Sequence, residues 1–372
     1  MKKLIISIIV VIFLIILAAF SKSKNDEDRL SSTPQPTISP LPEESQGGDK
    51  TEDAAEGEEI PAIEDYFPLE ADTEYVYEGE GNEYAAYRRY IDYIDVENKK
   101  LQTRTNNGGT ETVRVIQIKD GSLSVIYRVD ESYYRADFMK QTDDNDTEVL
   151  LMEPLTKGRS WTLSDGSKRS ITGEKVPLTT PYGSFDALEV TTEGEGGTTK
   201  DYYAVGVGLV KTLYQSEGLE ISSELRAVNK GAALTQQLLL FYADADEKIY
   251  TVPVEVSIKT GTDIRSVLEE AMKKELPKAS YLPLISSNTK LNSLTVEENE
   301  TLHADFSSEF VTEMNAGAGY ETLILQSITN TLGNYFGTNK VVITLEGKPY
   351  ESGHILMDEG EAFEVNMDQV VE

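Results

Sequence analysis

Alternation of apolar and polar residues in the middle of the chain is the feature that most restricts its fold. The segments VRVIQIK at 113–119 and SLSVIYRV at 122–129 both alternate, and only Asp120 and Gly121 stand between them. Such alternation indicates strands with one buried face, and Asp-Gly between two of them is a strong signal for a two-residue hairpin. We therefore predict an all-β domain over 63–232, built as a barrel-like or curved sheet.

Tyrosine is concentrated in the same region, which holds 14 of the chain's 20 tyrosines. They include Tyr84, Tyr87, Tyr90, Tyr93, Tyr202 and Tyr203. A tyrosine ring suits a half-buried strand whose surface meets water, so packing is the simpler interpretation. A tyrosine-lined ligand pocket is the alternative, and the sequence leaves it open.

The N-terminus carries an unbroken apolar run, LIISIIVVIFLIILAAF, at 4–20. As a helix with about 1.5 Å rise per residue it would span about 25 Å, close to the roughly 30 Å of a bilayer core. It is longer than the roughly 7 to 15 apolar residues of a usual secretory signal, which favours a retained transmembrane helix over a signal cleaved after Ser21. The anchor residues of this segment, 1–21, are Leu4, Ile9, Phe13, Leu17 and Phe20. Both alternatives place the rest of the chain outside the cytoplasm, either as a single-pass protein of the cell membrane or, after cleavage, as a secreted one.

Composition changes at 22–62, which holds five of the 13 prolines, 11 acidic residues and 4 basic ones. A segment so poor in large apolar side chains cannot bury enough surface to offset its ordering entropy, so we expect a disordered acidic tether. The whole chain has a net charge of -31 and no cysteine. This charge argues against nucleic acid as a partner. Without cysteine, no disulfide bond can stabilise the exported domains.

The pattern changes again over 233–372. Apolar strands at 238–244 and 248–258 precede two helical stripes, and the alternating segments 290–297 and 301–306 lie between the stripes. The first stripe is Ile264, Val267, Leu268, Ala271, Met272 and Leu276, with Thr262 as its expected cap and Pro277 as its end. The second stripe is Tyr320, Leu323, Ile324, Ile328, Leu332 and Tyr335, with Gly337 beyond its end. With a buried strand at 340–347, the order β-β-α-β-β-α-β predicts a two-layer α+β domain. The expected fold class of the chain is therefore α+β.

The stretch LHADFSSEF at 302–310 gathers a histidine, an aspartate and two serines. On a strand, His303, Asp305 and Ser307 share one face, about 6.6 Å apart in steps of about 3.3 Å per residue. The members of a catalytic triad must converge to about 2.6 to 3.2 Å, which parallel neighbours cannot do. We expect this face to be the wet side of the strand, and we predict no catalytic residue, no metal ligand and no cofactor.

Two further signals have a plain and a sharper interpretation. Asp144, Asp146 and Glu148 alternate as in a calcium loop, but Val149 occupies the place of the required glycine, so a solvated acidic loop is expected. Gln326 and Asn330 lie four residues apart and therefore on one face of a helix. Their amides are expected to bond the adjoining loop, and the sharper alternative is contact with a protein partner.

The C-terminal part resembles a known family. The segments LLLFYAD, YTVPVEVSI, VLEEAM, LHADFSSEFV, LILQSITNTL, VVITLEGKP and SGHI follow one another as in a GerMN domain, the module shared by sporulation and spore-germination proteins and by exported lipoproteins of spore-forming bacteria. The resemblance implies a scaffolding or binding part of an envelope assembly and no enzymatic activity. Two departures are EENE at 297–300, where many members have Asp-Gly, and the apolar run in place of a lipid anchor.

The segments TPYGSFDALEV at 180–190 and YYAVGVGLVKTLY at 202–214 are each expected to be one strand entered through glycine. Through them the middle region shows a weaker resemblance to a β-rich domain of bacterial envelope lipoproteins. The sequence therefore predicts a membrane-tethered, extracytoplasmic and non-catalytic binding or scaffolding protein of the cell envelope, in sporulation or germination. An envelope protein partner is expected, and self-association is open. A ligand-carrying barrel is one alternative, and a cell-wall hydrolase with two carboxylates is another.

Overall fold

A computed structural model describes residues 61–143, 147–297 and 300–371. The predictions for the apolar run, its anchor residues and almost all of the acidic tether lie outside these residues. Over the part that is described, no helix combines the length and the apolar content needed to cross a bilayer.

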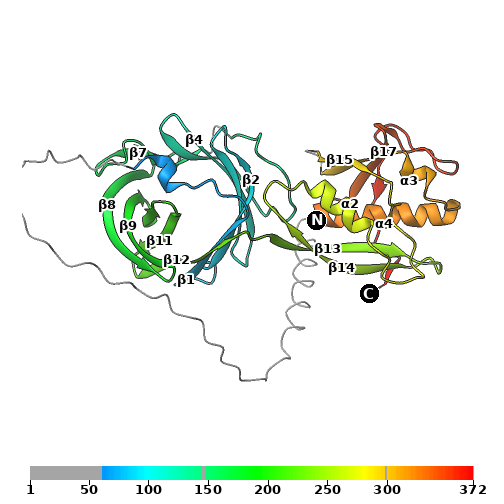
Figure 1. Cartoon of the computed structure of the whole chain (residues 1–372), viewed down its shortest axis with the longest axis horizontal. Helices are drawn as coiled ribbons and strands as arrows, with labels where there is room; N and C mark the ends of the chain where they lie inside the picture. The colour runs from blue at the N-terminus through cyan, green and yellow to red at the C-terminus, as the bar shows by residue number, and fades with distance from the viewer. Residues whose placement is uncertain (1–60, 144–146, 298–299, 372) are drawn as a thin grey trace, which may run out of the picture. The chain divides into compact units, whose positions relative to one another are not determined.

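The middle region forms one antiparallel sheet of 12 strands, in the order β6-β5-β4-β3-β2-β1-β12-β11-β10-β9-β8-β7. Figure 1 looks into the ring that these strands form. A short 3-10 helix, η1 (Ile63–Tyr66), precedes the sheet. The strands are β1 (Thr73–Glu80), β2 (Tyr87–Asp95), β3 (Lys100–Asn106), β4 (Glu111–Lys119), β5 (Ser122–Asp130), β6 (Glu148–Met152), β7 (Ser160–Thr162), β8 (Lys168–Thr180), β9 (Gly183–Gly194), β10 (Gly197–Ala204), β11 (Gly208–Ser216) and β12 (Leu219–Lys230). The barrel-like sheet predicted from alternation is confirmed.

The sheet curves because several of its strand pairs contain irregularities of register. The pairing of β8 with β9 shifts twice, between Ile171 and Val176, and bulges of this kind bend a strand and increase its twist. In the described residues β6 and β7 are the two edge strands of the sheet, and they do not pair with each other. Side chains bridge this gap instead: the Trp161 indole N–H and Arg169 both donate to the carbonyl of Val149, at 3.0 and 2.8 Å. The ring is therefore nearly closed.

Two sequence predictions about turns have different outcomes. Asp120 and Gly121 have φ of 50° and 69°, the left-handed pair that a two-residue hairpin requires, and β4 pairs with β5 across them as predicted. The segment 202–214, expected to be one strand, is instead the end of β10, a turn and most of β11. Gly206, with φ of 72°, makes the turn.

The C-terminal region forms a separate module with two sheets. Its elements are β13 (Leu234–Ala243), β14 (Ile249–Ile258), α2 (Ile264–Met272), β15 (Leu291–Val296), β16 (Thr301–Phe306), α3 (Glu309–Thr312), α4 (Ala318–Phe336), β17 (Lys340–Leu345), β18 (Lys348–Pro349), β19 (Phe363–Glu364) and β20 (Val370–Val371). The order β-β-α-β-β-α-β is confirmed for the main elements. One sheet has the order β13-β14-β20, and the other has β15-β16-β17-β18 with β19 on β17.

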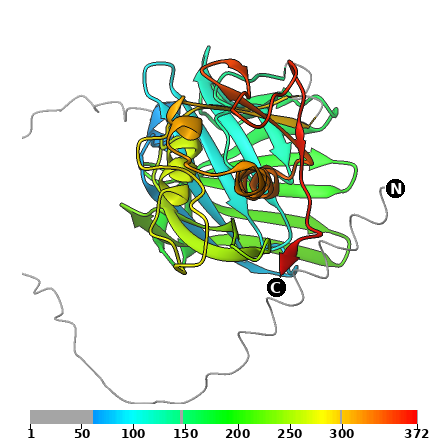
Figure 2. The same cartoon turned by 90° about the vertical axis from the view of Figure 1, so that its right-hand side faces the viewer.

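The expectation of a single sheet in two layers is wrong, and α4 gives the reason. This helix packs against β13 of one sheet and against β16, β17 and β19 of the other. Figure 1 shows α4 between the two groups of strands, and Figure 2 views it nearly end-on. Its buried residues run round most of its circumference, and a helix that is apolar on more than one side requires cover on more than one side. Tyr320, assigned to the stripe, is instead 41% exposed.

The helix ends also differ in part from the predictions. Gly337 caps α4 in the left-handed conformation, with φ of 67°, as predicted. The cap of α2 is Asp263 and not Thr262, because the Asp263 carboxylate accepts the backbone N–H of Arg265. The helix stops at Met272, well before Pro277.

Two glycines of α4 give a prediction of opposite sign. A Cβ on Gly333 would lie 2.2 Å from a methyl carbon of Val365, whereas Gly319 has nothing within 4 Å. We expect Gly333→Ala to lower the free energy of unfolding by about 1–3 kcal/mol through overpacking. We expect Gly319→Ala to raise it by up to about 1 kcal/mol, since alanine loses less backbone entropy in a helix. Urea denaturation of both variants measures the difference, and equal effects would contradict this packing.

Three buried charged side chains connect the 12-stranded sheet to the segment after β14. Asp92 on β2 accepts hydrogen bonds from Arg135 at 2.7 Å and from Arg104 at 3.2 Å. Arg135 also donates to the backbone carbonyls of Lys259 at 3.1 Å and Thr262 at 3.2 Å. All three charged side chains are at most 2% exposed. One guanidinium thus binds a carboxylate of the sheet and the backbone between β14 and α2.

Candidate functional site

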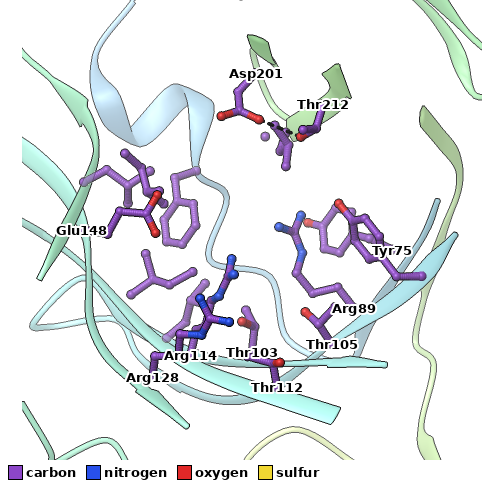
Figure 3. Close-up of a pocket in the computed structure, with 18 of the residues that line it drawn as sticks. Tyr75, Arg89, Thr103, Thr105, Thr112, Arg114, Arg128, Glu148, Asp201 and Thr212 are labelled. Atoms are coloured by element: carbon purple, nitrogen blue, oxygen red, sulfur yellow. Dashed lines mark hydrogen bonds between the residues drawn. The ribbon is translucent and has the colours of Figure 1, made fainter. Parts of the chain in front are cut away.

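The 12-stranded sheet encloses a cavity of about 610 Å³. A volume of this size is in the range of small-molecule pockets, roughly 300–1,000 Å³. Its walls carry arginines, carboxylates, threonines and tyrosine rings, several of which are drawn in Figure 3. The charged lining residues are Arg89, Arg114, Arg128, Arg169, Asp130, Glu148 and Asp201. The cavity is the candidate functional site.

Strand alternation directs these side chains inward. On β4, Thr112, Arg114 and Ile116 line the cavity at every second position, and on β2 Tyr87, Arg89 and Ile91 do the same. Arg114 and Arg89 therefore lie on strand faces where most of the adjacent inward-facing residues are apolar or aromatic.

Two of the four arginines are paired with carboxylates. Arg169 donates to Glu148 at 2.9 Å, and Arg128 donates to Asp130 at 3.0 Å. Glu148, which the sequence assigned to a solvated acidic loop, thus lies on β6 in an ion pair on the cavity wall. The other two residues of that loop prediction, Asp144 and Asp146, lie outside the described residues.

The other two arginines have no carboxylate partner in the described part of the chain. Arg89 donates to the Tyr77 hydroxyl at 2.8 Å, while its buried Nε has no hydrogen-bond acceptor. Arg114 makes no hydrogen bond or ion pair with any described residue, and burial lowers the pKa of its guanidinium. The Thr110 hydroxyl, also on the wall, is buried without a partner. Three donors on the cavity wall therefore have unused capacity.

Asp201 lies across the cavity from Arg114 in Figure 3. Its carboxylate accepts a hydrogen bond from the Thr212 hydroxyl at 2.6 Å. Burial raises the pKa of Asp201, because little solvent reaches the charged form.

Tyrosine rings form part of the same wall. The predicted tyrosines Tyr84, Tyr87 and Tyr203 line the cavity, and so does Tyr75. Tyr87 stacks on Tyr77 with ring centroids 4.3 Å apart. Tyr90 and Tyr93 point elsewhere, since their hydroxyls donate to the carbonyls of Ile258 and Thr262, each at 3.2 Å. Some of these tyrosines line the cavity and others pack elsewhere, and binding of a ligand by the first group stays a prediction.

Within the stretch 302–310, residues 302–306 form a strand with one wet face, as predicted, and Glu309 begins α3. Leu302, Ala304 and Phe306 are fully buried. The His303 imidazole contacts Glu297 at 3.1 Å, with both side chains more than a third exposed. Ser307 departs from the prediction: it is buried, and its hydroxyl accepts the backbone N–H of Lys290 at 2.9 Å. The three polar residues do not converge.

Asp305 on this strand gives a prediction about pH. Burial alone would raise the pKa of Asp305, but hydrogen bonds from Thr344, Asn292 and the Gly347 N–H outweigh burial and lower it. A lowered folded pKa stabilises the protein fully above the unfolded value of about 3.9, and this stability is lost as pH falls through the folded pKa. We expect the difference in unfolding free energy between wild type and Asp305→Asn to shrink from about pH 6 to about pH 3. Urea denaturation across this range measures it, and a constant difference would contradict the hydrogen bonding.

Gln326 and Asn330 are held within the C-terminal module. Gln326 donates to the carbonyl of Glu364 at 3.0 Å, and Asn330 donates to that of Asn366 at 2.7 Å. The backbone N–H of Asn366 in turn donates to the Asn330 side chain at 2.9 Å. Asn330 is fully buried, so both amides fasten the segment around 364–366 to α4. Contact of these residues with a partner stays a prediction.

The fold and the cavity place this chain in a class of two-part proteins, in which a β-sheet that encloses a pocket is joined to an α+β module. Residues 239–351 of that module match the family model Germane, described as sporulation and spore germination. The resemblance to GerMN is thus confirmed for residues 239–351, and the C-terminal module that contains them, 234–371, is called the Germane domain below. A search of curated proteins finds no match.

Solved structures that match parts of this chain include the tandem GerMN domains of the sporulation protein GerM from Bacillus subtilis, at 20% identity and a TM-score of 0.28. That match covers 35% of this chain and 46% of the other, so this chain spans about half of it. The first GerMN domain alone matches at 21% identity and a TM-score of 0.26, over 33% of this chain and 96% of the domain. A chain from Parabacteroides distasonis that is described as a lipoprotein matches at 15% identity and a TM-score of 0.27, over 44% of this chain and 98% of its own.

Proposed function

We propose that the chain is a non-catalytic binding protein of the cell envelope, held outside the cytoplasm and acting in sporulation or spore germination. The observation that supports this most is the Germane match over 239–351, in a module with the complete order of elements. The apolar run at 4–20 supports a single membrane anchor, and the acidic segment after it supports reach away from the membrane. In this proposal the Germane domain presents a surface to an envelope protein.

The buried charges support a role as one unit rather than as two independent modules. Arg135 binds Asp92 of the sheet and the backbone carbonyls of Lys259 and Thr262 at the same time. A buried ion pair that also satisfies backbone groups fixes relative orientation better than a flexible linker does. A ligand or partner bound to one module would therefore be carried in a fixed relation to the other.

Protease treatment of intact protoplasts that express the full chain tests the location. We expect the chain to sediment with membranes and to be digested from outside. A chain that stays in the soluble cytoplasmic fraction and is protected from protease would contradict the proposal.

A cell-wall hydrolase is the second candidate, because Glu148 is paired with Arg169 while burial raises the pKa of Asp201 in the same cavity. Two carboxyl groups in unlike environments are typical of acid and base pairs in glycosidases. Zymography on peptidoglycan separates the candidates: we expect no clearing by wild type, and clearing that is lost in Asp201→Asn would favour the hydrolase.

A further inference from the structure

We propose that the cavity of the 12-stranded sheet binds a small organic anion, with a carboxylate or phosphate group at Arg89 and Arg114 and a compact apolar body against the tyrosine rings. The ligand class goes beyond the envelope role proposed above and does not depend on it. The inference rests on the charges, donors and rings of the cavity wall.

The charge balance of the wall is the first step. Four arginines and three carboxylates line it, a formal excess of one positive charge, in a chain whose net charge is -31. Two arginines are neutralised by Glu148 and Asp130. Asp201, the third carboxylate, accepts a hydrogen bond from Thr212 and forms no ion pair with a described arginine. The cavity is thus a local positive region within a strongly acidic protein, and it attracts anions.

The unused donors are the second step. Burying a guanidinium without a counter-charge costs several kcal/mol, and proteins normally offset that cost with a partner. Arg114 forms no hydrogen bond or ion pair with a described residue, the largest opposing influence on its pKa being the charge of Glu148, and the buried Nε of Arg89 has no acceptor. The hydroxyl of Thr110 adds a third donor without a partner. Guanidinium groups with free N–H donors are the preferred ligands of carboxylate and phosphate oxygens.

The body of the ligand follows from what surrounds these donors. Arg89 lies over the ring of Tyr75, at 5.0 Å from its centroid. Tyr203 and Leu209 line the same space. A flat or compact apolar group would fit against these surfaces, while a fully apolar ligand would leave the arginines unsatisfied. An organic anion is therefore the ligand class that we assign to the cavity.

Calorimetry with a pair of probes tests the charge requirement. The full chain is reconstituted in nanodiscs of zwitterionic lipid and titrated with 1-naphthyl phosphate and with 1-naphthol, and empty nanodiscs supply the blank. The two probes share the same ring system and differ in the anionic group. We expect saturable binding of one 1-naphthyl phosphate per chain, at least about 10-fold tighter than binding of 1-naphthol.

Variants place the binding in the cavity. We expect Arg114→Gln to weaken 1-naphthyl phosphate at least about 10-fold and to leave 1-naphthol unchanged, whereas Arg114→Lys keeps much of the affinity. Arg88→Gln is the matched control, because Arg88 is the neighbour of Arg89 on β2 and its side chain is 69% exposed. The melting temperature of each variant shows whether it is folded.

Equal affinity for the two probes, or wild-type affinity in Arg114→Gln, would overturn the proposal. Binding that requires anionic lipid in the nanodisc would also overturn it, because the anion would then be a lipid head group outside the cavity. Native mass spectrometry of the purified chain gives a second readout: a bound mass that disappears in Arg114→Gln supports the proposal.

Discussion

Replacement of Asp92 by asparagine is expected to lower the free energy of unfolding by about 3–5 kcal/mol. Asp92 is fully buried, and its two carboxylate oxygens accept from Arg135 and Arg104. Asparagine has nearly the same shape, so the variant removes one negative charge, leaves Arg135 without a carboxylate among the described residues and leaves Arg104 with Glu111 alone. Removal of one partner of a buried ion pair is among the most destabilising single changes in proteins, because the other charge is left buried without its partner.

Urea denaturation of Asp92→Asn against wild type measures this effect. The control is Glu70→Gln, which removes the ion pair of Glu70 with Lys230. The side chain of Lys230 is 65% exposed and that of Glu70 is 39% exposed. An exposed pair contributes at most about 1 kcal/mol. A similar loss in both variants would show that the buried cluster does not hold the sheet to the segment after β14.

Phe306→Ala is the second prediction with a large effect, and it tests the parity of β16. Phe306 is fully buried, stacks on Phe310 with centroids 4.6 Å apart, and belongs to the core of the Germane domain. Deletion of a buried phenylalanine ring typically costs about 3–5 kcal/mol, since it removes apolar burial and leaves a cavity. We expect a loss in this range in the unfolding free energy.

His303→Ala on the same strand is the matched control. His303 lies on the opposite face and contacts Glu297 near the surface, so its loss should cost less than about 1 kcal/mol. Chemical denaturation of the two variants side by side gives the comparison. A larger loss from His303→Ala than from Phe306→Ala would mean that the wet and dry faces of β16 are exchanged.

Features fixed by short-range chemistry were predictable from the sequence. The hairpin at Asp120 and Gly121 follows from the left-handed conformation that its turn needs, and α4 follows from a helical period closed by Gly337. The wet face of β16 follows from strand alternation alone. Each of these depends on residues within about one or two turns of one another, which a local pattern describes well.

The two sheets of the Germane domain and the arginines of the cavity depend on contacts between distant segments, and the sequence did not predict them. The second sheet of the Germane domain contains Val370 and Val371, which pair with β14 more than 100 residues earlier. Arg89 and Arg114 meet in one cavity only because the register of β2, β3 and β4 brings them onto the same side of the sheet. One sequence signal could have indicated these cavity arginines. Arg89 lies on a strand between Tyr87 and Ile91, two residues away on either side, and both of these share its face and are large and apolar or aromatic.

Photocrosslinking in cells tests the central claim, that the Germane domain presents a binding surface to an envelope protein. A photoreactive phenylalanine analogue replaces Tyr320 or Leu356 on the Germane domain, which are 41% and 74% exposed. Control positions on the 12-stranded sheet are Tyr182 and Leu219, which are 44% and 45% exposed. We predict an adduct with a distinct envelope protein from the Germane positions and none from the sheet positions. Adducts from the sheet positions alone, or from none of the four, would contradict the claim.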